Sequence, residues 1–243
     1  MQFILDVHCH TISSGHAYST ITENAAHAAQ IGFTHIGISD HAPGIPGGAH
    51  IYNFSNLWTL PDVIQGVRVF KGVECNIMDA DGKLDLSASL LNDMDFVIAS
   101  MHRGAIPPTD CATHTRAMIS AMENNPDMHI LGHPGCRFFD IDIEAIVDAA
   151  ARTCTIIEIN NQSLVPGSFR FHGDETFLKI LEFCKAYNVP VIASSDAHYA
   201  TYVGNLDRAK AVIETAGMNE TQVLNTSAER FLAAIANKKG RYR

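Results

Sequence analysis

The sequence predicts an α/β fold in which a mainly parallel sheet forms the core of one domain, residues 1–243. Seven short runs rich in Val, Ile and Phe are apolar along nearly their whole length, which is typical of parallel strands covered on both faces. These runs alternate with stretches of helical periodicity, as strand–helix–strand connections do. No change of composition marks a linker, and roughly 200–250 residues is an ordinary length for one α/β barrel.

The expected elements follow from these two periodicities. Strands are predicted at Phe3–Val7, Thr34–Ser39, Val67–Val73, Asp95–Ser100, Met128–Gly132, Thr155–Asn160 and Val189–Ser194. Helices are predicted at Glu23–Ile31, Thr113–Asn124, Ile143–Arg152, Asp174–Tyr187, Leu206–Ala216 and Ala228–Lys238. A closed barrel and an open doubly wound sheet both fit this order of elements.

Local signals fix some of the boundaries. Thr20 followed by Glu23 is a capping box that opens the first helix, and Gly32 is placed to end it. Gly and Pro residues predict loops at Ala42–Ser55 and Ile106–Ala112. The basic end of the chain, residues 238–243, is predicted to be a solvated tail.

Charge and cysteine content narrow the classes of partner. The chain carries 26 acidic and 17 basic residues, a formal net charge of −9, and no basic block, so nucleic acid and membrane surfaces are poor candidates. The six cysteines form no C-x-x-C pair, as expected of reduced cytoplasmic thiols. No basic leader precedes Asp6 and no apolar run reaches about 18 residues, so a cytoplasmic location is predicted. The oligomeric state stays open, a homo-oligomer included.

Polar residues end every predicted strand, and 13 residues of the chain are His. In a parallel barrel the carboxyl ends of the strands meet on one face, where barrel active sites lie. Residues two apart on an extended segment point to the same side. His8 and His10 can therefore share a metal ion while Cys9 faces away, and Asp196 and His198 form a similar pair.

The sequence resembles the PHP (polymerase and histidinol phosphatase) family, particularly its small YcdX-like phosphatase branch, along nearly the whole chain. The resemblance rests on Asp6-Val7-His8-Cys9-His10-Thr11 with His16, Ser39-Asp40-His41, Gly72-Val73-Glu74, His102, Gly132-His133-Pro134 and Ser195-Asp196-Ala197-His198, with softer matches at Glu158-Ile159-Asn160-Asn161 and Leu224-Asn225-Thr226-Ser227. It implies a distorted (β/α)7 barrel, a TIM-like barrel with its active site at the C-terminal ends of the strands. It also implies three divalent metal ions, commonly Zn²⁺, with Mn²⁺ or Fe in some members.

Carried onto this chain, the family pattern implies nine metal ligands. They divide into a first site of His8, His10, Glu74 and Asp196, a second of Glu74, His102 and His133, with Glu74 bridging, and a third of His16, His41 and His198. Sets of three or four N and O ligands suit Zn²⁺ and leave a position free, as catalytic sites do. Three divalent ions outweigh two carboxylates, so the pocket would attract an anionic substrate even on an acidic chain.

These inferences predict an enzyme, a metal-dependent phosphoesterase that hydrolyses a small phosphomonoester. A metal-bound water would lose a proton, and the resulting hydroxide would attack phosphorus in line. His102 and Asp196 are predicted to be catalytic as well as ligating, with Asp196 or another metal-bound water protonating the leaving group. Arg103 is predicted to grip the substrate phosphate.

Three other functions remain as alternatives. Histidinol-phosphate phosphatase activity would use nearly the same ligands. A phosphodiesterase acting on nucleic acid is less favoured, because the sequence has no basic groove interleaved with aromatic residues. A non-catalytic metal-binding module is disfavoured because no ligand position is lost.

Several residues have a structural interpretation beside the functional one. Arg103 could instead form a salt bridge in its loop, and Arg137 and Arg170 are weaker candidates for phosphate contact. Asp6 and Asp40 are candidates to orient ligand imidazoles. Two of the remaining His lie in loops able to overhang the pocket, namely His50 and His172. The other four are expected to be structural or surface residues: His27, His35, His114 and His129.

Overall fold

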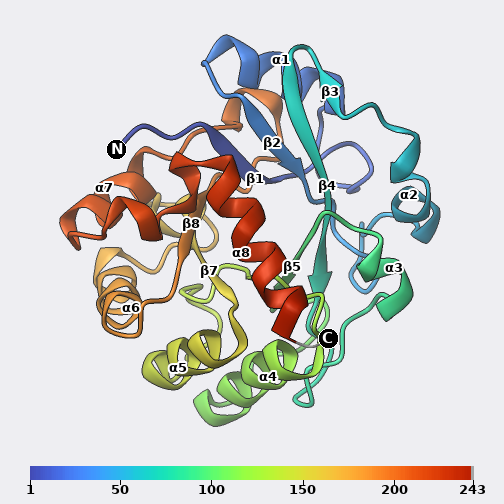
Figure 1. Ribbon diagram of the computed structural model, residues 1–243. Coiled ribbons are helices and arrows are strands. Elements are labelled where there is room, and N and C mark those ends of the chain that lie inside the picture. The colour runs from blue at the N-terminus through green and yellow to red at the C-terminus, as the bar shows by residue number, and fades with distance from the viewer. Residues whose placement is uncertain (242–243) are drawn as a thin grey trace.

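The computed structural model describes residues 1–241, whose strands form a nearly closed parallel barrel (Figure 1). The ring runs in the order β1-β2-β4-β5-β6-β7-β8, and every neighbouring pair is parallel. The ring strands are β1 (Leu5–Cys9), β2 (His35–Ile38), β4 (Val67–Asn76), β5 (Phe96–Ser100), β6 (Ile130–Leu131), β7 (Ile156–Asn160) and β8 (Val191–Ser194). All seven predicted strands are confirmed, and the barrel, not the open sheet, is the correct arrangement.

One strand lies outside the ring. β3 (Val63–Ile64) pairs antiparallel with the start of β4. The two are joined by Gln65 and Gly66, which have φ values of 53° and 79°. Two successive positive φ angles are typical of the tight hairpin turns whose twist matches the strands. A strand of two residues has no readable periodicity, and the sequence did not predict it.

Helices alternate with the strands, and most lie around the outside of the ring (Figure 1). They are α1 (Ile21–Gln30), α2 (Ile51–Ser55), α3 (Ala88–Asn92), α4 (Cys111–Asn124), α5 (Ile143–Thr153), α6 (Asp174–Ala186), α7 (Asp207–Thr215) and α8 (Ala228–Arg241). The six predicted helices are confirmed. The loop predicted at Ala42–Ser55 is partly wrong, because α2 occupies its end, with the imidazole of His50 accepting a hydrogen bond from the Tyr52 backbone N–H at 3.2 Å.

The ends of α1 follow the sequence signals. Thr20 Oγ1 accepts from the Glu23 backbone N–H at 3.2 Å, and Glu23 Oε2 accepts from the Thr20 backbone N–H at 2.7 Å. This confirms the capping box, which satisfies two N–H groups that the first turn leaves unpaired. Gly32 follows the helix with a φ of 83°, a left-handed conformation that Gly adopts without strain because it has no Cβ.

Helix α8 closes one end of the barrel and crosses the front of the ring in Figure 1. The Phe231 ring on α8 has its centroid 5.5 Å from that of Phe70 and 6.0 Å from that of Phe96. Around these rings an apolar layer fills the barrel interior, made of Leu5, Val7, Phe70, Phe96, Ile98, Ile130, Ile156, Ile192 and Leu224. This layer lies toward the amino ends of the strands, so the polar residues gather at the carboxyl ends.

The predicted solvated tail is wrong for Lys238, which is buried. Its Nζ donates to the Met122 carbonyl at 3.1 Å and to Thr155 Oγ1 at 2.8 Å. The reason is that α8 continues across the barrel and carries Lys238 inward with it. Residues 242 and 243 of that tail lie outside the described part of the chain.

The ring closes between β1 and β8 through a mixture of backbone and side-chain bonds. Past the end of β8, the Ala197 N–H donates to the His8 carbonyl at 3.2 Å, and the His10 N–H donates to the Ala197 carbonyl at 2.8 Å. Lower in the seam, the Asn225 amide donates to the carbonyls of Leu5 at 3.0 Å and Ala193 at 2.8 Å, and its Oδ1 accepts from the Ala193 N–H at 2.7 Å. One side chain thus takes the place of a missing backbone pairing.

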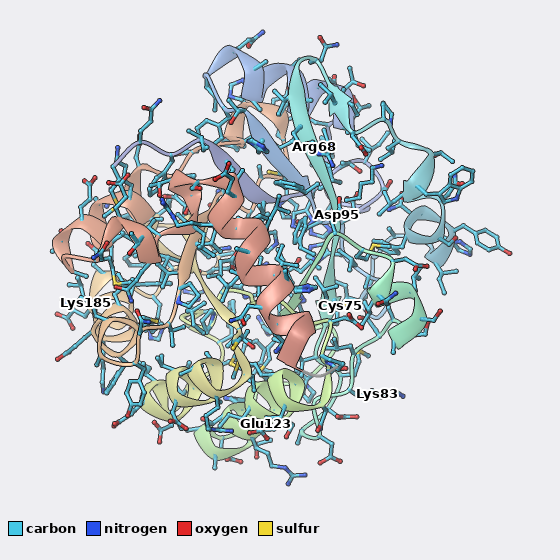
Figure 2. The ribbon with its side chains drawn as sticks, in the orientation of Figure 1. Arg68, Cys75, Lys83, Asp95, Glu123 and Lys185 are labelled. Carbon is cyan, nitrogen blue, oxygen red and sulfur yellow. The ribbon has the colours of Figure 1, made fainter. Side chains whose placement is uncertain are left out.

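Charged side chains lie mainly at the edge of the molecule. Figure 2 shows Glu123 on α4 and Lys185 on α6 at the periphery, with Cys75 of β4 inside the fold. Among residues 1–241, none of the helices combines the length and the apolar character that a membrane crossing requires.

Candidate metal centre

The strand alternation turns two carboxylates into the barrel. On β4, Val73 and Cys75 pack outward in the large apolar cluster, so Glu74 between them points inward. On β7, Ile157 and Ile159 pack outward in the same cluster, which turns Glu158 inward. Both carboxylates are fully buried at the polar end of the barrel.

Glu74 lies at the centre of five imidazoles. Its Oε1 is 3.0 Å from His133 Nε2 and 3.3 Å from His102 Nε2. Its Oε2 is 2.8 Å from His41 Nδ1, 3.3 Å from His8 Nε2 and 3.6 Å from His10 Nε2. These distances place one carboxylate within reach of ions on both of its sides.

The remaining predicted ligands complete the same cluster. Asp196 Oδ1 is 3.1 Å from His10 Nε2 and 3.6 Å from His198 Nδ1. The His198 ring centroid is 4.3 Å from that of His10 and 4.7 Å from that of His16, and His16 is 5.0 Å from His41. All nine predicted ligands therefore lie in one cluster at the carboxyl ends of the strands. Cys9 packs away from it, against the helix-facing apolar cluster that contains Ala25 and Ala28.

Burial favours the neutral form of four of these imidazoles, those of His10, His16, His102 and His133. It lowers the pKa of His102 to about 3, holds the pKa of His10 well below its ordinary value and lowers that of His133. Burial acts in the same direction on His8, but the carboxylates of Glu158 and Glu74 outweigh it and raise the His8 pKa well above its ordinary value. A neutral imidazole has a free lone pair, which is the form that binds metal. Burial also opposes ionisation of Glu74, but the neighbouring imidazole of His8, whose own pKa is raised, holds the Glu74 pKa well below the ordinary value.

The ligand atoms suit metal ions, and several of them make only close contacts within the cluster and no hydrogen bond. Six buried atoms of the cluster accept or donate no hydrogen bond: His8 Nε2, His10 Nδ1, His41 Nδ1, His41 Nε2, Glu74 Oε2 and His102 Nε2. Such orphaned groups are costly unless something else binds them. Three overlapping sets have ligand atoms within 4.8 Å of one another, namely His8, His10 and Glu74; His41, Glu74 and His102; and His10, His41 and His198. The last two sets place His41 between two groups, whereas the family pattern assigns it to one.

Glu158 supports the ligands without belonging to the predicted set. Its Oε1 is 2.5 Å from His8 Nδ1 and accepts from the Ser194 hydroxyl. Its Oε2 accepts from the His133 backbone N–H at 2.5 Å and from Asn160 Nδ2 at 3.3 Å. A proton held on His8 Nδ1 leaves Nε2 free as a ligand, the usual role of a carboxylate behind a metal-binding His.

Asn76 plays a similar part for His102. Its Oδ1 lies 2.7 Å from His102 Nδ1, and its amide nitrogen is 2.5 Å from Asp85 Oδ2 and 3.2 Å from the Ala42 carbonyl. The sequence did not single out Asn76. Its signal is its place at the end of β4, two residues after Glu74 and on the same face.

Asp6 and Asp40 order backbone and hydroxyl groups instead of imidazoles, which corrects the role expected for them. Asp6 accepts from the backbone N–H groups of His8 at 3.3 Å, Ser195 at 3.2 Å and Gly204 at 2.9 Å. Asp40 accepts from Thr11 and Ser14 in the loop that follows His10. Each carboxylate therefore shapes the segment that carries the ligands.

Two residues of the cluster have left-handed backbones. His133 has a φ of 30° and Asp196 a φ of 53°. Such conformations cost roughly 1–3 kcal/mol for residues other than Gly and gather at functional sites. The Glu158 bond to the His133 N–H is one of the contacts that hold this geometry.

Among the three arginines, Arg170 makes the direct contacts with the cluster. Its Nε is 3.4 Å from Asp196 Oδ2, and its Nη1 is 2.7 Å from His133 Nε2. Arg103 lines the cavity above the ligands, with its guanidinium carbon 5.0 Å from the Phe138 ring centroid. Arg137 packs on the same ring at 4.9 Å. Arg170, which the sequence ranked below Arg103, therefore lies nearer the predicted ligands, and the contact of Arg103 with substrate stays a prediction.

Four of the six remaining His have the following structural partners. His50 caps α2, and His172 Nδ1 lies 3.0 Å from the Gly135 carbonyl. His114 Nε2 accepts from the Thr109 N–H at 2.7 Å, and His129 Nδ1 accepts from the Val97 N–H at 3.0 Å. None of these four lines the cavity, which has a volume of about 890 Å³ and a floor formed by five of the predicted ligands together with Arg170: His16, His41, His102, Asp196 and His198.

Comparison of the sequence with known families matches two profiles. The PHP domain matches residues 6–162, and the PHP-associated region matches residues 178–239. The chain belongs to the PHP family. β8 lies in the second region but pairs with β7 of the first, so both regions contribute to the same PHP barrel.

PHP relatives of similar length are named as phosphatases. A probable phosphatase of Thermoanaerobacter sp. (strain X514) is 45% identical over 240 residues, covering 98% of this chain and 97% of the relative. A probable phosphatase of Acetivibrio thermocellus is 40% identical over 243 residues, covering 100% of this chain and 99% of the relative.

A solved structure shares the fold. Histidinol phosphate phosphatase of Lactococcus lactis subsp. lactis, crystallised with zinc, L-histidinol and phosphate, has a TM-score of 0.65 and is 18% identical. The match covers 88% of this chain and 94% of that one. At this identity the similarity establishes the TIM-like barrel fold.

Proposed function

We propose that this protein is a metal-dependent phosphatase that hydrolyses a small phosphomonoester, with residues 1–243 acting as one domain. The observation that carries the proposal is the set of six orphaned buried donor atoms gathered around Glu74. The PHP relatives named as phosphatases support the reaction class. The Lactococcus enzyme, which shares the barrel fold, was crystallised with zinc and phosphate, and this is consistent with the proposal.

We assign the nine clustered residues to three divalent ions, with Zn²⁺ favoured by the nitrogen-rich donor set and Mn²⁺ or Fe as alternatives. When bound, such ions supply Lewis acidity toward phosphate and lower the pKa of a bound water. Net hydrolysis joins a water oxygen to phosphorus and breaks the ester P–O bond. The two water protons end on the alcohol and on phosphate.

The protein's own residues orient the substrate. Arg170 lies beside Asp196 and His133 at the cavity floor, where a guanidinium can bond two phosphate oxygens. Burial would raise the pKa of Asp196, but Arg170 and His8 hold it well below its ordinary value. Asp196 is therefore assigned as an ionised ligand, and Arg103 at the rim as a second contact to anionic groups of the substrate.

The test replaces His102, whose imidazole lies 3.3 Å from Glu74. His102→Ala should abolish hydrolysis of phosphomonoesters while the circular dichroism spectrum keeps its native form, since one ligand is lost and the barrel contacts remain. His27→Ala, on the outer helix α1, is the matched control and should keep full activity. Undiminished hydrolysis by the His102 variant would overturn the assignment.

A further inference from the structure

The cavity above the candidate metal centre is much larger than a phosphate group requires. Its volume of about 890 Å³ lies in the range that takes drug-sized ligands, roughly 300–1,000 Å³. The ligands and Arg170 occupy the floor, so the walls must meet the part of the substrate beyond the phosphate. If the protein is the phosphatase proposed above, these walls select the leaving group.

The walls above the floor are largely apolar. Ile45 and Pro46 of the segment after β2 contribute to the lining, and so do Val165, Pro166 and Phe169 of the segment after β7. Apolar walls with a few polar groups at the base are the usual design of sites that bind small organic molecules.

Phe169 presents an aromatic ring to this cavity. The residue is 64% exposed, so much of its surface is free for a ligand to cover. Its ring centroid lies 4.6 Å from that of Phe138. Phe138 is in turn packed against the guanidinium groups of Arg103 and Arg137. Phe169 is therefore supported from behind and offers a flat surface for stacking.

The charges of the lining disfavour a cation. Of the described residues that line the cavity, Asp196 alone is a carboxylate, and it already pairs with Arg170. Arg103 and Arg170 are the charged groups that remain, and bound divalent ions would add to their positive potential. An ammonium group on the leaving group would lose its hydration and gain no partner.

We propose that the cavity binds phosphomonoesters whose leaving group is planar, aromatic and uncharged, with the ring stacked on Phe169. Phe169 is then the residue that determines specificity. Leaving groups that carry an ammonium group, as histidinol does, are disfavoured. The proposal therefore disfavours histidinol phosphate as the substrate, although the protein shares its fold with a histidinol phosphate phosphatase.

The test uses three esters of primary alcohols that differ in ring and charge: benzyl phosphate, 4-(aminomethyl)benzyl phosphate and methyl phosphate. The zinc- or manganese-loaded protein should hydrolyse benzyl phosphate with a kcat/KM about tenfold above each of the other two, the size expected of one stacking contact. Equal or higher kcat/KM for the aminomethyl ester would overturn the inference.

Three variants test whether the selectivity for the benzyl ester arises at Phe169. Phe169→Ala should lower the benzyl-to-methyl selectivity ratio about tenfold. Tyr52→Ala removes an exposed ring on α2 that is not part of the cavity lining, and should leave the ratio unchanged. Gln162→Glu places a carboxylate in the lining at nearly constant volume and should raise the relative kcat/KM of the aminomethyl ester several-fold. An unchanged ratio in the Phe169 variant contradicts the proposal.

A binding measurement separates this inference from the proposed function. Benzylphosphonate cannot be hydrolysed at its P–C bond, and its affinity by calorimetry should fall about tenfold in Phe169→Ala. If no ester is hydrolysed, methyl phosphate included, the proposed function fails. The stacking site is then supported by a Phe169-dependent affinity for benzylphosphonate and overturned by its absence.

Discussion

At the scale of single residues, the least predictable feature of the site is Glu158. Its four partners come from β1, β7, the end of β8 and the turn after β6, and only the folded barrel brings them together. The sequence nevertheless carries a signal, because Glu158 stands between two Ile residues on a buried strand. By contrast, four of the nine predicted ligands form a His-x-His and an Asp-x-His pair, and the other five are single His or Glu residues at or after strands, so the residue pattern and the family resemblance together point to them.

Glu158→Gln tests this supporting role. All four partners of Glu158 are donors, and an amide accepts at one position while presenting N–H groups at the other. We expect metal affinity to fall about 10–100-fold, the usual effect of removing such a carboxylate. A competition titration with a chelator measures it. Glu123→Gln on the surface of α4 is the control, and equal metal affinity in both variants would count against the role.

At the scale of elements, periodicity located the long helices and all ring strands, and missed the shortest pieces. β3 has two residues, and α2 and α3 have five each, too few for a period to show. The predicted bounds of the first strand, Phe3–Val7, are shifted from the observed Leu5–Cys9. The shift arises because His8 and Cys9 look like the start of a polar loop, whereas both lie buried within the strand.

Gly32→Ala tests the end of α1. Gly32 has a φ of 83°, and a Cβ there would meet nothing within 4 Å, so backbone strain is the sole steric effect. The variant should lose about 1–2 kcal/mol of unfolding free energy in urea denaturation. Gln30→Ala on the exposed side of α1 is the control and should change stability by about 0.5 kcal/mol or less. Equal midpoints for the two variants would show that the left-handed backbone costs nothing here.

At the scale of the whole molecule, the contacts that close the barrel also bring residues of the candidate site together. The β1–β8 seam joins His8 and His10 to the segment that carries Asp196 and His198. Periodicity left barrel and open sheet undecided because it carries no information about whether the outer strands meet, and the family resemblance was what implied the barrel that the structure confirms. The residues of the cavity walls could not be predicted from the sequence either, because the segments after β2 and β7 meet in space but share no sequence pattern.

Asn225→Leu tests the closure. The change leaves the Leu5 carbonyl and both backbone groups of Ala193 without their buried partner. At about 1–3 kcal/mol for each unsatisfied group, unfolding free energy should fall by about 3 kcal/mol or more in urea denaturation. Asn225→Asp, which keeps one acceptor and loses both donors, should also be destabilised. Wild-type stability in both variants would mean that the seam does not depend on this side chain.

The central claim is that nine residues at one end of this barrel bind catalytic divalent metal ions. It is tested most directly by elemental analysis of the purified protein before and after chelation, with phosphomonoester hydrolysis followed in the same samples. The account predicts about three divalent ions per chain, loss of activity with their removal and recovery on adding Zn²⁺ or Mn²⁺. A chain that binds no divalent metal and hydrolyses no phosphomonoester with either ion added would contradict it.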